Sequence, residues 1–265
     1  MKIFEIIDEE LNKTLGCLLY YEKEKSFIIE LVDNLDEWDA PLLLTSFVKE
    51  NIYTIPRDVS LLWVQERIIP SNRQNISSIL SNHRLKEYDE MKLLELADGK
   101  CSQDSIYIKK IDSLPGYVKK RGLKNLTDLV VLDDNKLLCF FADGCVKKID
   151  LSAFEQLDSI QKIIKHQQVF ASGKIGTGGY CVTFNDSIDI AAYMLYSCKK
   201  ALPLVSSDFT AFVQKNILDT AESCNCLDCS RQNLAYMVSK GMLNPIKENV
   251  KGNLYIKSDV LKNKW

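Results

Sequence analysis

Two adjoining stretches determine the fold expected for the carboxy-terminal part of the chain: Thr220-Ala-Glu-Ser-Cys-Asn-Cys-Leu-Asp-Cys-Ser230 and Arg231-Gln-Asn-Leu-Ala-Tyr-Met-Val-Ser-Lys-Gly241. Thr220 can cap a short helix, and Glu222 adds a negative charge to its first turn, where the helix dipole favours it. Ser230 can cap a second helix ten residues later. The two stretches therefore predict a pair of short helices joined by a tight turn.

The second of these helices has an apolar side and a stop signal. Leu234, Met237 and Val238 fall on one helical face, at the spacing of a stripe that packs on a core. Gly241 follows the last helical residues, where left-handed backbone is needed to end a helix. We expect the apolar face to be buried and the opposite face to lie in solvent.

The residues that follow predict a hairpin. Two strand-like segments, Leu243–Lys247 and Leu254–Lys257, flank the polar loop Glu248–Asn253, so lysines stand on and around the tip. Ser258 can cap a last short helix, Asp259–Lys264.

This arrangement resembles the DNA-binding domains of the excisionase and MerR-type families. Their pattern runs Thr-Ala-Glu-Ala-Ala, a leucine-rich turn, Ser-Arg, a recognition helix ending in Gly, and a wing. The match runs from Thr220 through Ser258 without a gap. The resemblance implies a winged helix-turn-helix over roughly Leu218–Trp265, with double-stranded DNA as partner. One departure is Asp228, where the family prefers Gly, and we expect a slightly altered turn there.

Under this resemblance the outward side chains of the second helix read the DNA. Arg231 and Gln232 are the candidates for base edges, because Arg suits guanine and Gln suits adenine. Side chains of the wing would contact phosphates, which set affinity and register but not sequence. The predicted DNA contacts are Arg231, Gln232, Tyr236, Lys240, Lys247, Lys251 and Asn253. The alternative is that these are solvated polar residues on a helix that contacts protein.

Three cysteines in the first stretch invite a zinc interpretation, because thiolates bind Zn²⁺ well. Cys224, Cys226 and Cys229 lie two and three residues apart, with no histidine nearby and no second Cys-x-x-Cys pair. Under the resemblance, Cys224 takes a small-residue position and the other two take apolar core positions, where cysteine packs as a small hydrophobe. We expect neither a metal nor a cofactor.

Charge is unevenly spread along the chain although the net charge is only −2. Residues 1–60 hold six Lys/Arg against thirteen Asp/Glu, a balance of −7. Residues 230–265 hold seven Lys/Arg against Glu248 and Asp259, a balance of +5. A basic end on an acidic body suits a phosphate-binding module, and it equally suits a solvated surface.

The rest of the composition bounds the class of protein. Hydrophobic residues make up 46% and charged residues 26% of the 265, which is typical of a globular chain. No apolar run is long enough to cross a bilayer, so no membrane contact is expected, and the acidic start lacks the order of a secretory signal. An odd count of nine cysteines suggests reduced thiols. We expect a cytoplasmic protein.

The whole chain is expected to be α+β, with three small domains at residues 1–118, 123–202 and 207–265. The first contains a hairpin, Leu15–Tyr21 followed by Ser26–Val32, and Lys119–Gly122 is expected to be a linker. The second begins with a meander of three strands between residues 126 and 151.

The first segment resembles the amino-terminal subdomain of HipA-type toxin kinases. The resemblance lies in Arg67-Ile-Ile-Pro-Ser-Asn-Arg73, a helix, Tyr88-Asp-Glu-Met-Lys-Leu-Leu94 and Ala97-Asp-Gly-Lys-Cys-Ser102. Nothing follows that matches a kinase catalytic loop or metal-binding motif, so kinase activity is not carried over. The resemblance implies a contact surface.

The second segment is similar to a small bacterial family of unknown function, often found in gene pairs that look like toxin–antitoxin modules. The similarity rests on Leu138-Cys-Phe-Phe-Ala-Asp143-Gly144 with the strand that follows, and on Asp186-Ser-Ile-Asp189. It implies a fold but no chemistry.

No catalytic constellation emerges from the sequence. His83 and His166 lie in different segments without a Ser or Cys motif beside them. Gly173–Gly179 precedes a strand instead of opening a helix, so a hairpin turn is a better interpretation than a phosphate loop. Asp186 and Asp189 could form a carboxylate pair, and a helix-capping role explains them as well.

We therefore expect a non-enzymatic, DNA-binding transcription regulator of a bacterium or phage, toxin–antitoxin-like, whose first two domains contact a protein partner or form a homodimer. The alternative is an antitoxin- or inhibitor-type protein that neutralises a partner protein by direct binding, the acidic first domain masking a basic partner.

Overall fold

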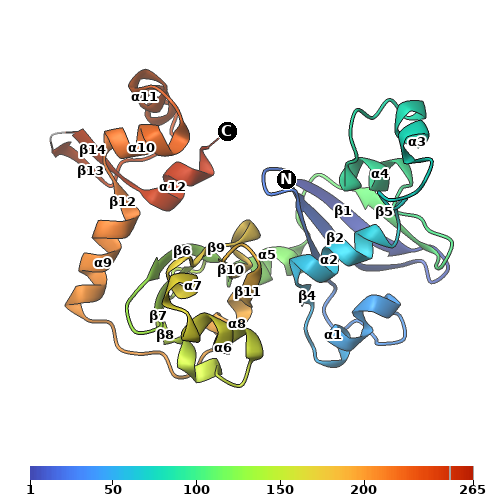
Figure 1. The fold of residues 1–265 in the computed structure, drawn as a ribbon, viewed down its shortest axis with the longest axis horizontal. Coiled ribbons are helices and arrows are strands. Elements are labelled where there is room, and N and C mark those ends of the chain that lie inside the picture. The colour runs from blue at the N-terminus through green and yellow to red at the C-terminus, as the bar shows by residue number, and fades with distance from the viewer. Residues whose placement is uncertain (251, 265) are drawn as a thin grey trace. The chain divides into compact units, whose positions relative to one another are not determined.

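The computed structural model describes residues 1–250 and 252–264, and its backbone forms antiparallel sheets with short helices around them (Figure 1). The predicted α+β class is confirmed at this level. The chain divides into two compact units, residues 1–123 and 124–265, which are described separately. Within the described residues, no helix combines the length and apolar character needed to span a membrane.

The first unit is built on one five-stranded antiparallel sheet, in the order β4-β3-β2-β1-β5. Its strands are β1 (Lys2–Asp8), β2 (Lys13–Tyr21), β3 (Ser26–Leu31), β4 (Thr54–Ile55) and β5 (Ile106–Lys110). Its helices are α1 (Thr45–Lys49), α2 (Arg57–Gln65), α3 (Ile76–Asn82), α4 (Glu90–Leu96) and α5 (Gly116–Gly122), with a 3-10 turn at Leu42–Leu44. The predicted hairpin is confirmed as β2 and β3.

The core of this unit lies between the sheet and the helices. Trp63 on α2, Ile29 on β3 and Leu94 on α4 are each completely buried within one apolar cluster. Burial of side chains of this size stabilises a fold by about 1.5–3 kcal/mol each.

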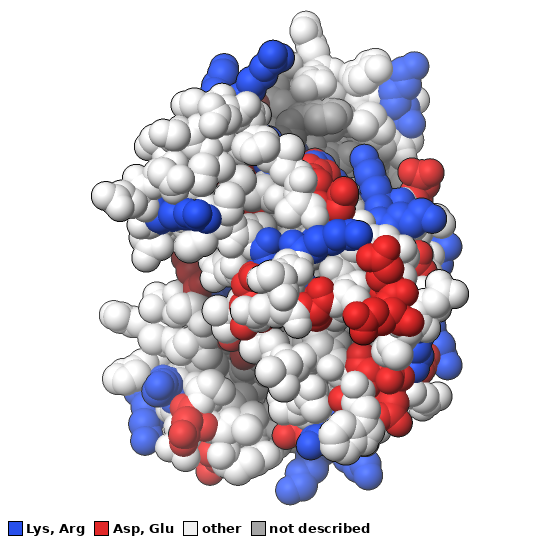
Figure 2. All heavy atoms as spheres, turned by 90° about the vertical axis from the view of Figure 1, so that its right-hand side faces the viewer, with Lys and Arg blue, Asp and Glu red and all other residues white. Residues whose placement is uncertain are grey.

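The face drawn in Figure 2 carries Asp and Glu side chains gathered in a patch, with Lys and Arg side chains around it.

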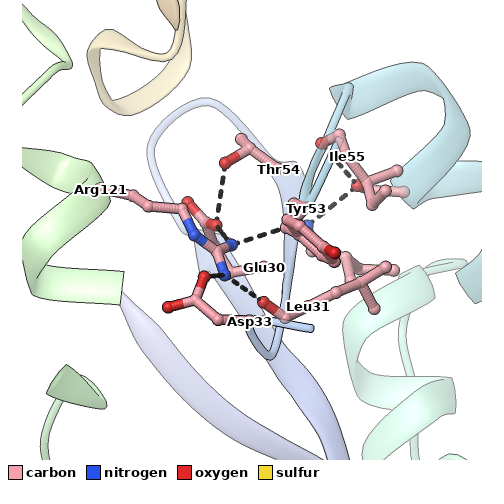
Figure 3. Close-up of polar contacts among 9 residues, drawn as sticks. Glu30, Leu31, Asp33, Tyr53, Thr54, Ile55 and Arg121 are labelled. Carbon is pink, nitrogen blue, oxygen red and sulfur yellow. Dashed lines mark hydrogen bonds and ion pairs between the residues drawn. The ribbon is translucent and has the colours of Figure 1, made fainter. Parts of the chain in front are cut away.

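The expected linker at Lys119–Gly122 is wrong, because these residues belong to α5. Val118 on this helix is buried. Arg121 reaches back to the sheet, where its Nη1 donates to Glu30 Oε2 at 2.5 Å and its Nη2 donates to Asp33 Oδ1 at 2.8 Å (Figure 3). The basic residues were expected to belong to a linker, but Arg121 is the partner of a buried carboxylate.

The surroundings of Glu30 are closed by further hydrogen bonds. The Glu30 side chain is fully buried, and Thr54 Oγ1 also donates to its Oε2 at 2.9 Å. Arg121 donates to the main-chain oxygens of Leu31 and Tyr53 as well (Figure 3). One guanidinium therefore ties α5 to both β3 and the segment that enters β4.

The second unit begins with two small antiparallel sheets around one core. The first sheet has the order β6-β7-β8, so the predicted three-stranded meander is confirmed. Its strands are β6 (Leu126–Val131), β7 (Lys136–Phe141) and β8 (Val146–Asp150). The other sheet, β11-β10-β9, consists of β9 (Lys174–Ile175), β10 (Cys181–Phe184) and β11 (Ile188–Ala191). The helices are α6 (Asp158–Lys165), α7 (Gln167–Ala171) and α8 (Ala192–Tyr196), with 3-10 turns at Leu151–Phe154 and Thr177–Gly179.

The rest of the second unit contains α9 (Ser206–Asn216), β12 (Ile217–Leu218), α10 (Thr220–Leu227), α11 (Arg231–Ser239), β13 (Lys247–Val250), β14 (Gly252–Ile256) and α12 (Lys257–Lys262). Its three strands form an antiparallel sheet in the order β12-β14-β13. The pair of helices and the hairpin that the sequence predicts are therefore present, and α9 and β12 were not predicted.

Three boundaries in this region differ from expectation. Asp219, not Thr220, caps α10, and Glu222 completes a reciprocal capping box with it. The first strand of the hairpin begins at Lys247 and not at Leu243. The last helix begins before Ser258, so that residue does not cap it.

Helix α9 is tied to the first sheet of its unit by polar contacts. Lys148 on β8 pairs with the buried Asp208 at 2.9 Å, and the Asn216 side chain donates to Asp128 on β6. Asp128 is itself 7% exposed, and burial raises the pKa of its carboxyl above the usual value, against hydrogen bonds from Leu129, Ser258 and Asn216 that lower it. These contacts place both ends of α9 against the meander.

Candidate nucleic-acid interface

Helix α11 is oriented by its cap and by its apolar side. Ser230 accepts a hydrogen bond from the Asn233 amide at 3.2 Å, as predicted, and the helix begins at Arg231. Leu234 and Met237 are each only 1% exposed. Because they are three residues apart on one face, the opposite face must point away from the core.

The predicted reading residues all lie on this opposite face. Arg231, Gln232, Tyr236 and Lys240 are exposed. A helix turns about 100° per residue, so the first three side chains occupy one half of the helix surface, and Lys240 follows directly at the end of the helix. The Lys240 Nζ atom stands 5.7 Å from the centre of the Tyr236 ring, and Tyr236 is 56% exposed. The helix thus presents two cations, an amide and an aromatic ring to solvent.

A small apolar cluster holds α11 in this orientation. Its buried members come from α10, α11, the loop after α11, β14 and α12, and are Cys224, Leu227, Leu234, Met237, Leu243, Tyr255 and Val260. Because a helix of this length is marginal without tertiary packing, this cluster is what stabilises α11.

The three clustered cysteines contribute to this core as expected under the resemblance. Cys224 is buried, and Cys226 and Cys229 are partly buried against the cluster. Burial, together with the neighbouring Cys224, raises the pKa of the Cys229 thiol. Within residues 1–250 and 252–264, no three His, Cys, Asp or Glu side chains are grouped in a way that could hold a metal ion.

The turn between α10 and α11 has the left-handed backbone of a helix end. Asp228 has φ 53° and ψ 49°, the conformation that glycine adopts most readily. The resemblance implied an altered turn at this residue, but Asp228 takes the left-handed geometry itself. Gly241 does the same after α11, at φ 67°.

The hairpin places its predicted contacts unequally. Lys247 is exposed on β13, opposite Leu254 of β14. Asn253 is half-buried, and its side-chain amide donates to the Tyr255 hydroxyl at 3.3 Å. Lys251 lies outside the described residues. Lys257, at the start of α12, is a further exposed cation beside the hairpin. It was counted in the basic charge of residues 230–265, but it was not among the predicted DNA contacts.

The two histidines considered for catalysis belong to different units, and the two aspartates make separate contacts. His83 and His166 are both exposed. Asp186 pairs with Lys174, and Asp189 accepts a hydrogen bond from Thr183 at 2.7 Å. Asp186 lies in the turn between β10 and β11, and Asp189 lies on β11, so neither caps a helix. The glycine-rich stretch contains β9 and the turn that leads to β10, which pairs with β9 as a hairpin, the interpretation that the sequence favoured.

Comparisons of the chain with protein-family models, with curated proteins and with solved structures give no match.

Proposed function

We propose that residues 218–265 form a winged helix-turn-helix and that the protein is a non-enzymatic regulator that binds duplex DNA through it. In this proposal α11 is the recognition helix, α10 is the helix before it, and the β13–β14 hairpin is the wing. The observation that carries the proposal is the polar outward face of α11, set on a packed core by its inward face.

The chemistry of that face suits a major groove. Arg231 and Gln232 stand at the amino-terminal end of α11, the end from which recognition helices contact base edges. Arg can donate two hydrogen bonds to guanine, and Gln can donate and accept with adenine. Lys247 and Lys257 are placed on the hairpin side, where cations contact phosphates.

We further propose three domains within the chain, at 1–123, 124–202 and 207–265; the first extends five residues beyond the expected 118 because α5 packs on its sheet. Three separate buried apolar clusters support this division, since each falls within one of these ranges. The resemblances to HipA-type and toxin–antitoxin-associated domains make the first two candidates for protein contact.

The test is selection of bound duplexes from a random-sequence DNA pool, followed by affinity measurements on the selected sequence. Arg231→Ala and Gln232→Ala should each lower the preference for the selected over a scrambled duplex by about 5- to 150-fold, the worth of a good base contact. Asn233→Ala is the matched control, because Asn233 is exposed on the same helix but outside the predicted contacts. A pool without enrichment, or a preference that survives both substitutions, would refute the proposal.

The second candidate is that this module binds a protein. Exposed apolar side chains beside α11 favour it, namely Met242 at 43% and Ile246 at 48%. In that case a protein partner should copurify with the parent chain and be lost in the double variant Met242→Ser, Ile246→Ser. Neither the parent nor the variant would bind duplex DNA.

A further inference from the structure

An open groove of about 640 Å³ lies on the first unit. Its walls come from the end of β1 and the turn after it, from the segment before α1, from the end of α2, and from the residues around the start of β5. None of the residues assigned to DNA contact belongs to it. It therefore calls for a separate explanation.

The rim of this groove exposes large apolar side chains. Trp38 is 87% exposed, Leu42 is 94% exposed and Leu11 is 52% exposed. Tryptophan is among the residues most enriched at the energetic centres of protein interfaces, because it buries a large area with little loss of conformational entropy. Because Trp38 and Leu42 are not packed in the core of this unit, their apolar surface is available for contact with a partner.

The rim is held in place and is not a loose loop. The Trp38 amide donates to Asp36 Oδ1 at 2.9 Å, and Asp39 pairs with Lys13 of β2 at 2.5 Å. Leu44, at the end of the 3-10 turn that begins with Leu42, is completely buried in the core. The exposed rings and methyl groups are thus presented by an ordered backbone.

The groove is acidic. Four carboxyl groups line it, on Asp8, Asp39, Glu66 and Asp104. Among the described lining residues, Arg67 is the one Lys or Arg, and its side chain is 3% exposed and bonded to Asp104 at 2.6 Å. Burial raises the pKa of Asp104, but the Arg67 hydrogen bond and charge outweigh this and hold it below its usual value. Asp39 is already paired with Lys13 and Asp104 with Arg67, so Asp8 and Glu66 are the lining carboxylates for which no ion pair is described, and the groove keeps a negative balance.

We propose that this groove binds a basic protein segment, in which an aliphatic or aromatic side chain is flanked by Lys or Arg. The apolar anchor packs between Trp38 and Leu42, and the flanking cations face the carboxylates. Nucleic acid is disfavoured by the same carboxylates, which repel phosphate. This surface is independent of the winged helix-turn-helix proposal.

The probe is a phage-displayed library of random 16-residue peptides, selected on the full chain and counter-selected on the Trp38→Ala, Leu42→Ala double variant. We expect the selected peptides to combine Lys or Arg with Leu, Ile, Phe or Trp. Their synthetic versions should bind at least tenfold more weakly to either single variant, and more weakly to Glu66→Lys or in higher salt. Leu96→Ala, which removes a side chain that is 52% exposed elsewhere on the unit, should change affinity less than twofold.

The outcomes separate cleanly. A library that yields nothing above the double variant, or that yields acidic or uncharged peptides, overturns the proposal. So does peptide binding that Trp38→Ala and Leu42→Ala leave intact. Because both side chains are almost fully exposed, the variants should keep the thermal midpoint and the circular dichroism spectrum of the parent.

Discussion

Arg121 shows how much one side chain at the end of a unit can contribute. Its guanidinium is the cation that pairs with the fully buried Glu30, and it also satisfies main-chain oxygens on two segments. Removing one partner of a buried ion pair leaves an uncompensated buried charge, which destabilises a fold far more than replacing both partners by apolar residues.

We predict that Arg121→Met lowers the free energy of unfolding of the first unit by about 3–5 kcal/mol. Urea unfolding followed by tryptophan fluorescence measures this loss, in a Trp38→Phe, Trp265→Phe background that leaves the buried Trp63 as the fluorophore. The double variant Arg121→Met, Glu30→Leu should recover much of it, because no buried charge remains. A single variant no less stable than the double would contradict the assigned role of the pair.

Gly241 and Gly122 form a matched pair for testing backbone strain. At both positions an added methyl group meets no atom within 4 Å, but only Gly241 has a positive φ, at 67°. Gly241→Ala should therefore lower the local stability of α11 by about 1–2 kcal/mol, and Gly122→Ala should not lower the stability of α5. Hydrogen exchange of the α11 and α5 amides measures both; equal effects would mean that strain is not the cause.

Asp128 gives the second unit a pH dependence of definite sign. Its folded pKa is raised above the ordinary 3.8, chiefly by burial. Its contribution to stability is therefore complete below that value and is lost as the pH rises through the folded pKa. Asp128→Asn cannot ionise, so its thermal midpoint relative to the parent should rise between pH 4 and pH 7. If the thermal midpoints of the parent and of Asp128→Asn changed in parallel with pH, burial would not raise the pKa of the Asp128 carboxyl.

Among helices and strands, those fixed by local signals could be predicted from the sequence. The α11 stripe and its Ser230 cap lie within a few residues of one another, and so does the β2–β3 hairpin. The misses are non-local. β12 is two residues long and exists only because it pairs with β14, more than thirty positions later. No pattern among neighbouring residues predicts such a strand.

The candidate site was predictable to the same extent. Helical periodicity placed Arg231, Gln232, Tyr236 and Lys240 in solvent, where they lie. It could not show that the Asn253 amide is used by the Tyr255 hydroxyl, because that contact depends on the pleat of β14. It also gave no reason to separate Lys257 from the other lysines.

For the hairpin as an element, we predict that Lys247→Ala weakens binding to all duplex sequences alike. Loss of one phosphate contact should make the slope of log affinity against log salt shallower by about 1. Fluorescence anisotropy with a mixed-sequence duplex measures the slope without knowledge of the preferred site. Lys136→Ala on β7 is the control, since that lysine lies outside the module, and an equal change there would argue for a diffuse charge effect.

For the chain as a whole, the separate cores predict that residues 1–123 and 124–265 fold independently. Each fragment should fold alone, and the two circular dichroism spectra should sum to that of the full chain. Calorimetry measures the transitions. A fragment that stays unfolded alone would show that its stability depends on the other unit.

The long reach of Arg121 has a consequence for biosynthesis. Glu30 and Arg121 are 91 positions apart, and ribosomes add about 5–20 residues per second. For roughly 5–20 s, a nascent chain therefore carries an anion without the cation it will be buried with. The first sheet cannot close around Glu30 until α5 has emerged, so the amino-terminal half of the newborn polypeptide should remain a client for chaperones until that helix is made.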